Sequence, residues 1–355
     1  MRRHNILLWV TLLQRTSRKT GALLASALYY KKQGNQTYSE VPQVLTTGRN
    51  FMKLAMIGVG KMGANMVRRL VHGGHEVVAY DVDSDSVDKL AGEHDNIVAA
   101  ATLKTLIKAL DAPRSIWLMV PHQFVDESIE ALLEAGLSEG DLLIDGGNSN
   151  FNLSKQRADY LQQKKIHFVD SGTSGGVWGL ENGYSIMVGG TDEAVAMIRP
   201  AIETLAPAKD KGWGHVGPAG AGHYVKMVHN GIEYGMMQAF AEGFEMLEAK
   251  KEMNIDLAQV SEIWQHGSVV RSWLLDLIAD AFHSDKSLST LSDYVDDSGE
   301  GRWTVQDSIE LGVPTPVLTL ALQMRFRSRQ DDAFAGKVLN AMRAGFGGHT
   351  IRSAE

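Results

Sequence analysis

Residues 53–63 read KLAMIGVGKMG, an apolar run that leads into the glycine pattern G-x-G-x-x-G, and a helix-length segment follows. In a strand, turn and helix of this kind, Gly58 makes the tight turn, Gly60 lets the backbone approach a pyrophosphate, and Gly63 allows the helix to pack closely on the strand. The free N–H groups at the start of the helix attract the anion. We therefore predict a dinucleotide-binding site that includes these three glycines and Met62.

A second apolar run, residues 76–80, ends in Asp81, at about the twenty-residue distance expected for the carboxylate that binds the adenosine ribose. A carboxylate there would repel the 2′-phosphate of NADP, and residues 82–85 contain no Lys or Arg to neutralise it. We therefore predict NAD as the favoured cofactor and NADP as the less favoured one. The alternative is that Asp81 only caps the following helix.

Further apolar runs continue this pattern along the chain. They are separated by helix-length segments and lie at 115–120, 141–144, 166–169 and 185–188. The alternation predicts a doubly wound parallel sheet, whose ligands lie at the carboxyl ends of the strands. The residues that follow such strand ends are Val120 and Pro121, Asn148, and the turn Ser174-Gly175-Gly176. The N–H groups of that turn are suited to hold a carboxylate or phosphate, although the turn can also be only a flexible loop.

After about residue 218 the strand-like pattern ends, and helical segments rich in Ala, Leu, Met and Glu dominate, including one from His223 to about Lys250. The predicted fold class is an α/β Rossmann-type doubly wound sheet followed by an all-α C-terminal domain. We divide the chain into an N-terminal extension (1–51), an NAD-binding domain (52–218), and a helical domain for substrate binding and oligomerisation with a C-terminal tail (219–355). A chain of 355 residues is long enough for two such domains.

The N-terminal extension differs from the rest of the chain in charge. It holds eight Lys or Arg residues and one Glu, whereas the whole chain has a net charge of −7. Three interpretations compete: a cleaved organellar targeting peptide, a weak secretory signal, or residues upstream of a true start at Met52. We favour the third, because the first strand begins directly after Met52.

Composition restricts the classes of function. The absence of Cys excludes disulfides, thiolate metal sites and thiol catalysis, and it agrees with a reducing compartment. We therefore expect a cytoplasmic protein, without excluding organellar targeting by residues 1–51. The acidic body of the chain argues against nucleic acid as a partner. The apolar runs of the extension are too short to cross a bilayer, and no membrane segment is expected elsewhere.

Residues 222–235, GHYVKMVHNGIEYG, place polar side chains along one side of a predicted helix. Lys226, Asn230 and Glu233 stand at positions i, i+4 and i+7, and His229 lies beside this line. With a rise of about 1.5 Å per residue, Lys226 and Glu233 start roughly 10 Å apart, which suits a base and an acid that act on different carbons of one ligand. On most helices such a set is only a solvated face, but the nucleotide signature upstream favours catalysis.

From Met52 to near its C-terminus, the chain resembles the 6-phosphogluconate dehydrogenase family of decarboxylating enzymes. The segments that carry the resemblance are 58–63, 144–149, 174–176, 226–234, 299–303 and 346–349. The helical domain is shorter than in the long members, so the resemblance is to the short form. It implies that 6-phospho-D-gluconate is oxidised and decarboxylated to D-ribulose 5-phosphate with reduction of NAD or NADP, and that no metal is needed.

The resemblance also implies roles for single residues. Lys226 matches the general base on the 3-hydroxyl, and Glu233 matches the acid that protonates C1 of the enediol. The residues that match the gluconate-binding set are Asn148, Ser174, Gly175, Gly176, His229, Asn230 and Tyr234. The residues that match the phosphate-binding set are Arg325, Arg343 and His349. Arg343 and His349 lie in a tail that reaches a neighbouring subunit in the family, which implies a homodimer or homotetramer. Val120, Pro121 and Asn148 lie on the cofactor side.

Departures from the family pattern leave some questions open. Ser298 stands where long members have a phosphate-binding lysine, and Glu300 lies nearby, so the need for the substrate phosphate stays open. Asp81 and Val82 stand where long members have residues that favour NADP, which agrees with NAD. One alternative is a sibling dehydrogenase for 3-hydroxyisobutyrate or tartronate semialdehyde, which needs neither Glu233 nor a phosphate clamp. The other is a non-catalytic NAD-binding sensor, which would tolerate the loss of its lysine.

Overall fold

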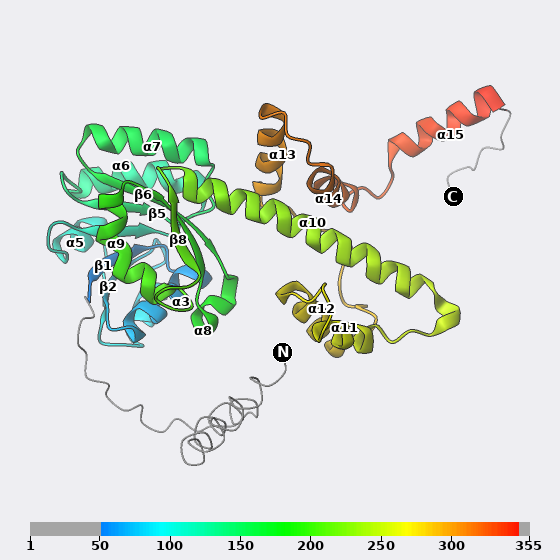
Figure 1. Ribbon diagram of the computed structural model, residues 1–355. Helices are drawn as coiled ribbons and strands as arrows, with labels where there is room; N and C mark the ends of the chain where they lie inside the picture. The colour runs from blue at the N-terminus through cyan, green and yellow to red at the C-terminus, as the bar shows by residue number, and fades with distance from the viewer. Residues whose placement is uncertain (1–50, 348–355) are drawn as a thin grey trace, which may run out of the picture. The chain divides into compact units, whose positions relative to one another are not determined.

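The computed structural model describes residues 51–347, which form an eight-stranded sheet followed by a helical part (Figure 1). The strands lie in the order β3-β2-β1-β4-β5-β6-β7-β8. Their bounds are β1 (Lys53–Ile57), β2 (Glu76–Tyr80), β3 (Ile97–Ala99), β4 (Ser115–Leu118), β5 (Leu142–Asp145), β6 (His167–Ser174), β7 (Ser185–Gly190) and β8 (Trp213–Gly217). Of the predicted N-terminal extension, residues 1–50 lie outside the described part of the chain.

The helices between the strands cover both faces of the sheet. Their bounds are α3 (Lys61–His72), α4 (Ser84–Ala91), α5 (Leu103–Lys108), α6 (Val125–Ala135), α7 (Phe151–Gln163), α8 (Gly179–Asn182) and α9 (Asp192–Leu205), with short 3-10 turns η2 (His122–Phe124) and η3 (Gly176–Trp178). Strand β1 shows why both faces need cover. Leu54 and Met56 belong to one hydrophobic cluster with α3 and α9, whereas Ala55 and Ile57 belong to another with α5 and α6. Because successive side chains of a strand point to opposite faces, an apolar run needs partners on both sides. The doubly wound fold is confirmed.

The structure corrects the predicted sheet in three places. Strands β6 and β7 pair antiparallel, so the sheet is mainly but not wholly parallel. Strands β3 and β8 were not predicted, because β3 has only three residues and β8 reads WGHVG, which has no clear apolar pattern. Strand β6 extends past the predicted end at residue 169, since residues 170–174 pair with β7.

The long helix α10 (Ala221–Ala249) begins the helical part and packs on β6 and β7. The contact is close because glycines face each other: a Cβ atom on Gly222 would lie 2.5 Å from the carbonyl oxygens of Asp170 and Met187. The helical elements that follow are η4 (Lys251–Met253), α11 (Leu257–Gln265), α12 (Trp273–Ser284), α13 (Glu300–Glu310), α14 (Pro316–Arg327) and α15 (Phe334–Gly347). The predicted helical C-terminal part is confirmed, with a first helix close to its predicted bounds.

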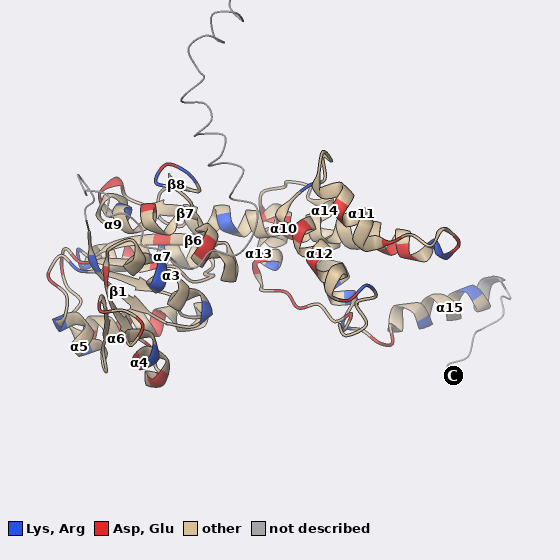
Figure 2. Cartoon of the chain, turned by 90° about the horizontal axis from the view of Figure 1, so that it is seen from below, with Lys and Arg blue, Asp and Glu red and all other residues tan. Residues whose placement is uncertain are grey.

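Two small hydrophobic clusters hold the helical part together. Phe244 of α10 packs with Leu275 and Phe282 of α12 and with residues of α11. Tyr234 of α10 packs with Ala321 and Leu322 of α14. Charged residues of one sign gather on several of these helices: α11 and α12 carry Asp or Glu but no Lys or Arg, whereas α14 and α15 carry Lys or Arg but no Asp or Glu (Figure 2). Between residues 51 and 347, no helix combines the length and apolar character that a membrane span requires.

Candidate active site

The glycine loop joins β1 to α3 with the geometry that its sequence requires. Gly58 has φ of +92°, and a Cβ atom there would lie 2.6 Å from the Met119 carbonyl oxygen, so glycine is needed on both counts. A Cβ atom on Gly63 would collide with the Gly58 carbonyl oxygen. At Gly60, by contrast, a Cβ atom would meet no other atom within 4 Å. The space beside the Gly60 backbone is therefore open, so a pyrophosphate can approach it closely. Met62 packs against the hydrophobic core.

Asp81 lies at the end of β2 and faces this loop. Its Oδ2 accepts a hydrogen bond from the Val59 N–H at 2.7 Å, and its Oδ1 accepts one from the Asp83 N–H at 3.1 Å. Helix α4 starts at Ser84 with Asp83 at its N-cap, so Asp81 is not the capping residue. The neighbouring Val82 is 94% exposed and brings no positive charge. The loop and the carboxylate together fit an adenosine dinucleotide.

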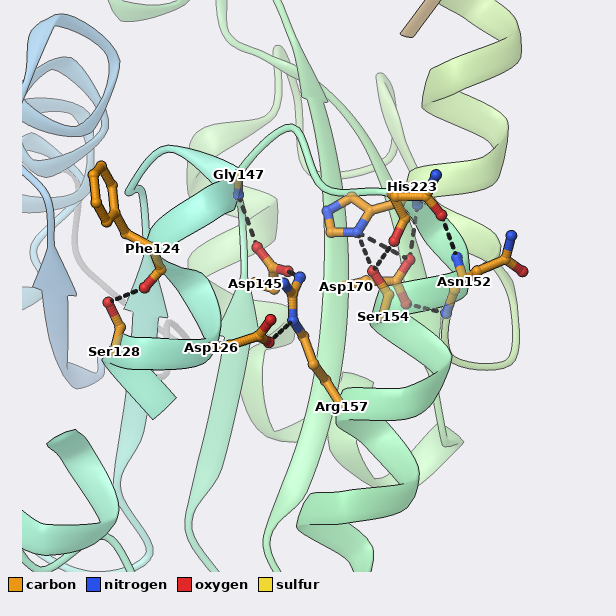
Figure 3. Close-up of polar contacts among 12 residues, drawn as sticks. Phe124, Asp126, Ser128, Asp145, Gly147, Asn152, Ser154, Arg157, Asp170 and His223 are labelled. Atoms are coloured by element: carbon orange, nitrogen blue, oxygen red, sulfur yellow. Dashed lines mark hydrogen bonds and ion pairs between the residues drawn. The ribbon is translucent and has the colours of Figure 1, made fainter. Parts of the chain in front are cut away.

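The loop after β5 carries Asn148 and is held from below by a buried ion pair (Figure 3). Arg157 of α7 donates from Nη1 to Asp145 Oδ2 at 2.9 Å and from Nε to Asp126 Oδ1 at 2.6 Å. The other Asp145 oxygen accepts from the Gly147 N–H at 3.1 Å. A Cβ atom on Gly147 would lie 2.8 Å from the Val120 carbonyl oxygen, so this loop adjoins the segment after β4 that continues to Pro121. The predicted strand-end residues thus lie at neighbouring strand ends.

A carboxylate fixes the start of α10 (Figure 3). Asp170 of β6 is fully buried and accepts hydrogen bonds from the N–H groups of Gly220 at 2.6 Å and His223 at 2.7 Å. The His223 ring also bonds through Nδ1 to Ser154 Oγ at 2.7 Å. Helix N-termini attract negative charge, and Asp170 supplies it from another element because Gly220 has no capping side chain. One turn beyond His223 comes Lys226.

Lys226 is 5% exposed and forms the centre of the site. Its Nζ donates to Asn148 Oδ1 and to Glu300 Oε1, both at 2.6 Å. Its stem lies over Gly172 of β6, where a Cβ atom would come within 2.5 Å of the Lys226 Cβ. The amino group is therefore held between the end of β5 and the start of α13.

The predicted gluconate-binding residues of α10 lie around the same carboxylate. Asn230 donates from Nδ2 to Glu300 Oε2, and His229 Nδ1 bonds to Asn230 Oδ1 at 3.0 Å. The Tyr234 hydroxyl accepts from the Ser298 N–H at 3.0 Å. Ser174 ends β6, and Gly175 and Gly176 follow with φ of +132° and +51°, which glycine adopts without strain.

The residues predicted to hold the phosphate are only partly brought together. The Arg325 guanidinium stacks on the Tyr234 ring, 3.5 Å from its centroid, and Nη1 donates to the Asp296 carbonyl oxygen at 2.7 Å. Arg343 is exposed on α15, without a hydrogen bond or ion pair to any described residue. His349 lies outside the described residues. Glu233 is half-buried, and its carboxyl group has no hydrogen bond or ion pair within the described part of the chain.

Glu300 is the residue that sequence reasoning missed. From the sequence it is only a neighbour of the phosphate pocket, whereas the structure places its carboxylate on Lys226 and leaves it 2% exposed. An acidic residue in the first turn of a helix is usually exposed to solvent, where it interacts with the helix dipole. The sequence position of Glu300 therefore does not indicate that its carboxylate is buried. Its place between Gly299 and Gly301, where a Cβ atom on Gly301 would lie 2.5 Å from the Tyr234 ring, is the one local sign of close packing.

This arrangement can perform proton transfer beside a nucleotide. Among the described residues, the Lys226 nitrogen keeps a free position near the carboxyl ends of the strands, and the Glu233 carboxyl group, two turns along the same helix, has no partner. Among residues 51–347, no group of three or more His, Asp or Glu side chains is placed to hold a metal ion.

Two family models match the chain. The NAD binding domain of 6-phosphogluconate dehydrogenase matches residues 53–216. The 6-phosphogluconate dehydrogenase C-terminal domain matches residues 222–344. Together they span the sheet and the helical part.

Individual relatives agree with these matches. YqeC of Bacillus subtilis (strain 168) is 43% identical over 298 residues, which are 84% of this chain and 98% of that protein. An NAD(+)-dependent, decarboxylating 6-phosphogluconate dehydrogenase of Haloferax volcanii is 42% identical over 302 residues, with the same coverage of 84% and 98%. The solved Plasmodium falciparum 6-phosphogluconate dehydrogenase has a TM-score of 0.72 at 26% identity, over 85% of this chain and 66% of that one. A 3-hydroxyisobutyrate dehydrogenase of Mycobacterium tuberculosis shares the fold, with a TM-score of 0.63 at 19% identity. The chain belongs to the 6-phosphogluconate dehydrogenase family.

Proposed function

We infer that the chain is an enzyme that oxidises 6-phospho-D-gluconate with NAD(P) and releases CO2 to give D-ribulose 5-phosphate. The observation that carries this inference is the buried Lys226 amino group bonded to Asn148 at a strand end, with Glu233, which has no partner among the described residues, two turns further along α10. The Haloferax volcanii relative, named as NAD(+)-dependent and decarboxylating, supports it. The 3-hydroxyisobutyrate dehydrogenases share only the fold at 19% identity and below.

Lys226 acts first in the proposed reaction. In its amine form it takes the proton of the 3-hydroxyl while a hydride leaves C3. The nicotinamide of the bound cofactor supplies the acceptor for that hydride. As an ammonium, Lys226 then donates a hydrogen bond to the new 3-keto oxygen, where negative charge develops as CO2 leaves. Burial of Lys226 strengthens this interaction, because water does not compete for the oxygen.

Glu233 acts last. Loss of CO2, with return of the Lys226 proton to the former keto oxygen, leaves an enediol. Glu233 then gives a proton to C1 while Lys226 takes the hydroxyl proton, which yields the ketose phosphate. A carboxyl group committed to an ion pair could not move its proton freely, so the lack of a partner among the described residues supports this role. The half-buried position keeps the group within reach of a ligand on the same side of the helix as Lys226.

The remaining predicted residues are proposed to bind the substrate. Arg325 is held in place by Tyr234 and by the Asp296 carbonyl, so its guanidinium is positioned in advance for a phosphate. The gluconate carboxylate and hydroxyls are assigned to Asn148, Ser174, Gly175, Gly176, His229, Asn230 and Tyr234. Arg343 and His349 complete the phosphate site from the tail of a neighbouring copy, which makes the enzyme a homodimer or homotetramer.

NAD is proposed as the preferred cofactor. The Asp81 carboxylate next to the glycine loop disfavours a 2′-phosphate, and Val82 offers no cation in its place. The Plasmodium falciparum structure has NADP+ as its cofactor, so both nucleotides need to be compared.

The test is steady-state formation of NADH and NADPH from 6-phosphogluconate by the purified chain, with CO2 release followed in parallel. We expect NADH and CO2 in equal amounts. Lys226→Met should lower kcat about 10³-fold and Glu233→Gln about 10²-fold, because each removes a proton-transfer group. Glu242→Gln is the matched control, since Glu242 lies on the same helix and, within residues 51–347, its carboxylate bonds only to Gln238.

Other outcomes would change the assignment. Reduction without CO2, or turnover restricted to 3-hydroxyisobutyrate-like acids, would move the chain to the sibling dehydrogenases. Nucleotide binding that survives Lys226→Met, in a wild-type protein without turnover on any of these acids, would indicate a sensor.

A further inference from the structure

The Lys226 nitrogen has two of its three bonding positions already used. A lysine amino group can make three interactions besides its bond to carbon. Asn148 Oδ1 and Glu300 Oε1 each take one, at 2.6 Å. They come from different elements, the loop after β5 and the first turn of α13, so the nitrogen is fixed from two sides. Residues 51–347 supply no third partner, so one position is left, which is an N–H in the ammonium form and a lone pair in the amine form.

The Glu300 carboxylate is itself held so that it cannot rotate away. Its second oxygen accepts hydrogen bonds from Asn230 Nδ2 and from Ser298 Oγ, the latter at 3.2 Å. Ser298 is in turn tied through its N–H to the Tyr234 hydroxyl at 3.0 Å. Every partner of Glu300 is thus anchored to α10 or to the segment before α13. A side chain fixed by its own network can fix another to within about 0.5 Å.

Burial distinguishes the Lys226–Glu300 ion pair from surface ion pairs. Lys226 and Glu300 are 5% and 2% exposed, so water is not available to replace either group as a partner. Surface ion pairs of Lys exchange partners with solvent and fix no direction. A lysine between two buried acceptors keeps a single orientation, because any rotation about its last bonds would leave a buried donor or acceptor unpaired.

We propose that Glu300 is a positioning residue for the base: together with Asn148 it aims the remaining position of Lys226 Nζ at the 3-hydroxyl of the substrate. The proposal rests on the function inferred above. Glu300 acts through Lys226, and its own two oxygens are occupied. It also explains why a carboxylate lies near a site for an anionic substrate, where its charge alone would oppose binding.

The test is Glu300→Gln, which keeps the shape of the side chain but replaces one acceptor oxygen with a donor. The amide keeps one acceptor, so it cannot serve Lys226 on one side and Asn230 with Ser298 on the other, and the side chain that directs Nζ is no longer held itself. We expect kcat to fall about 10²-fold, because a displacement of a catalytic group by about 1 Å lowers the rate by about that factor in other enzymes. KM should rise by less than kcat falls, because the main loss is in the reacting geometry, and Asn230 is the proposed substrate-binding residue that Glu300 holds. With substrate deuterated at C3, the isotope effect on kcat should rise, and Glu300→Asp should recover part of the rate.

Thr304→Val is the matched control. Thr304 is 5% exposed on the same helix, and its hydroxyl donates to the Met227 carbonyl oxygen at 2.9 Å, so it also joins α13 to α10. The same hydroxyl also donates to the Glu300 carbonyl oxygen at 2.9 Å, but among the described residues it has no hydrogen bond to the Lys226 amino group or to the Glu300 carboxylate. We expect this variant to lose thermal stability while it keeps the wild-type isotope effect. If it lowers kcat and raises the isotope effect as Glu300→Gln does, then Glu300 only holds the helices together and the proposal is wrong.

Two further outcomes are separable. A wild-type protein that yields no NADH and CO2 from 6-phosphogluconate contradicts the proposed function itself. An active wild type with a Glu300→Gln variant of equal kcat and isotope effect contradicts only the role of Glu300. If Glu300→Gln does not fold, Glu300→Asp decides: a folded variant with unchanged kcat and isotope effect overturns the proposal, and a reduced kcat with a raised isotope effect supports it.

Discussion

Asp297 links the start of α13 to the end of α14, and its ionisation should make stability depend on pH. Arg302 and Arg329 both donate to its carboxylate, each with one contact at 2.7 Å, and the side chain is 4% exposed. The hydrogen bond from Arg302, with help from Arg329, lowers the pKa of Asp297 from 3.8 to about 2. A carboxylate with a lowered pKa stabilises the fold above its unfolded pKa, and that stability is lost as pH falls towards the folded pKa. We expect the wild type to lose about 1.5 kcal/mol from this group between pH 6 and pH 2.5.

The measurement is the free energy of urea unfolding across that pH range. Asp297→Asn should be less stable than the wild type at pH 6, and the difference should shrink as the pH is lowered. Asp332→Asn is the control, since Asp332 is paired with Lys337 but its side chain is 70% exposed, and such pairs contribute less than about 1 kcal/mol. A gap between wild type and Asp297→Asn that stays constant with pH would contradict the assignment of the lowered pKa.

The contact between β6 and α10 depends on the absence of a side chain at Gly172. A Cβ atom there would lie 2.5 Å from the Lys226 Cβ and 2.6 Å from the Gly222 carbonyl oxygen. Gly172→Ala should therefore push the start of α10 away from the strand and cost about 1–3 kcal/mol, as overpacking does. It should also lower kcat, because Lys226 moves with the helix. Urea unfolding and steady-state kinetics on the same preparation measure both effects.

Gly214→Ala separates overpacking from the general effect of alanine in a strand. Gly214 lies in β8, and a Cβ atom there would meet nothing within 4 Å. This variant should stay within about 0.5 kcal/mol of the wild type and keep its kcat. Equal losses in Gly172→Ala and Gly214→Ala would show that the close contact in the structure is not what limits stability.

The proposed oligomer should be visible as an association through the helical part. Large apolar side chains are exposed there on several helices, among them Ile309 (74%), Val317 (61%), Leu320 (60%) and Phe334 (75%). On α15 they accompany basic residues without any acidic one, which Figure 2 shows as blue without red. Exposed apolar surface of this kind is typical of an interface between copies. By sedimentation equilibrium, we expect a mass of two or four times 38.8 kDa.

A charge in this apolar surface should shift the equilibrium towards single chains. Leu320→Glu would bury an unpaired carboxylate in the interface, and the apparent dissociation constant should rise at least about tenfold, equivalent to about 1.4 kcal/mol. Phe124→Glu is the control: Phe124 is also exposed, at 49%, but it lies in η2 of the sheet domain. A wild type that sediments as a single chain at micromolar concentration would contradict the oligomer.

Much of the molecule follows from the sequence alone, because the relevant signals are local. The glycine loop, the distance to Asp81, and the helical spacing of Lys226, Asn230 and Glu233 all depend on neighbours within one or two elements. Periodicity also predicts the doubly wound sheet and the helical part, and the structure confirms both. The roles of the individual site residues and the domain boundary at 218 stay predictions.

The tertiary structure alone decides the contacts between residues that are distant along the chain. Lys226 and Glu300 are 74 positions apart, and Asp170 bonds to Gly220, the N-cap of α10, which lies 50 positions later. Hydrophobic periodicity in the sequence does not indicate either pair, because each depends on how closely two packed elements approach. Glycines such as Gly172 and Gly222 set that distance. The sequence likewise does not indicate the antiparallel pairing of β6 and β7, because the apolar pattern of a strand is the same for either direction. Local sequence therefore determines which groups the site contains, and packing determines which of them touch.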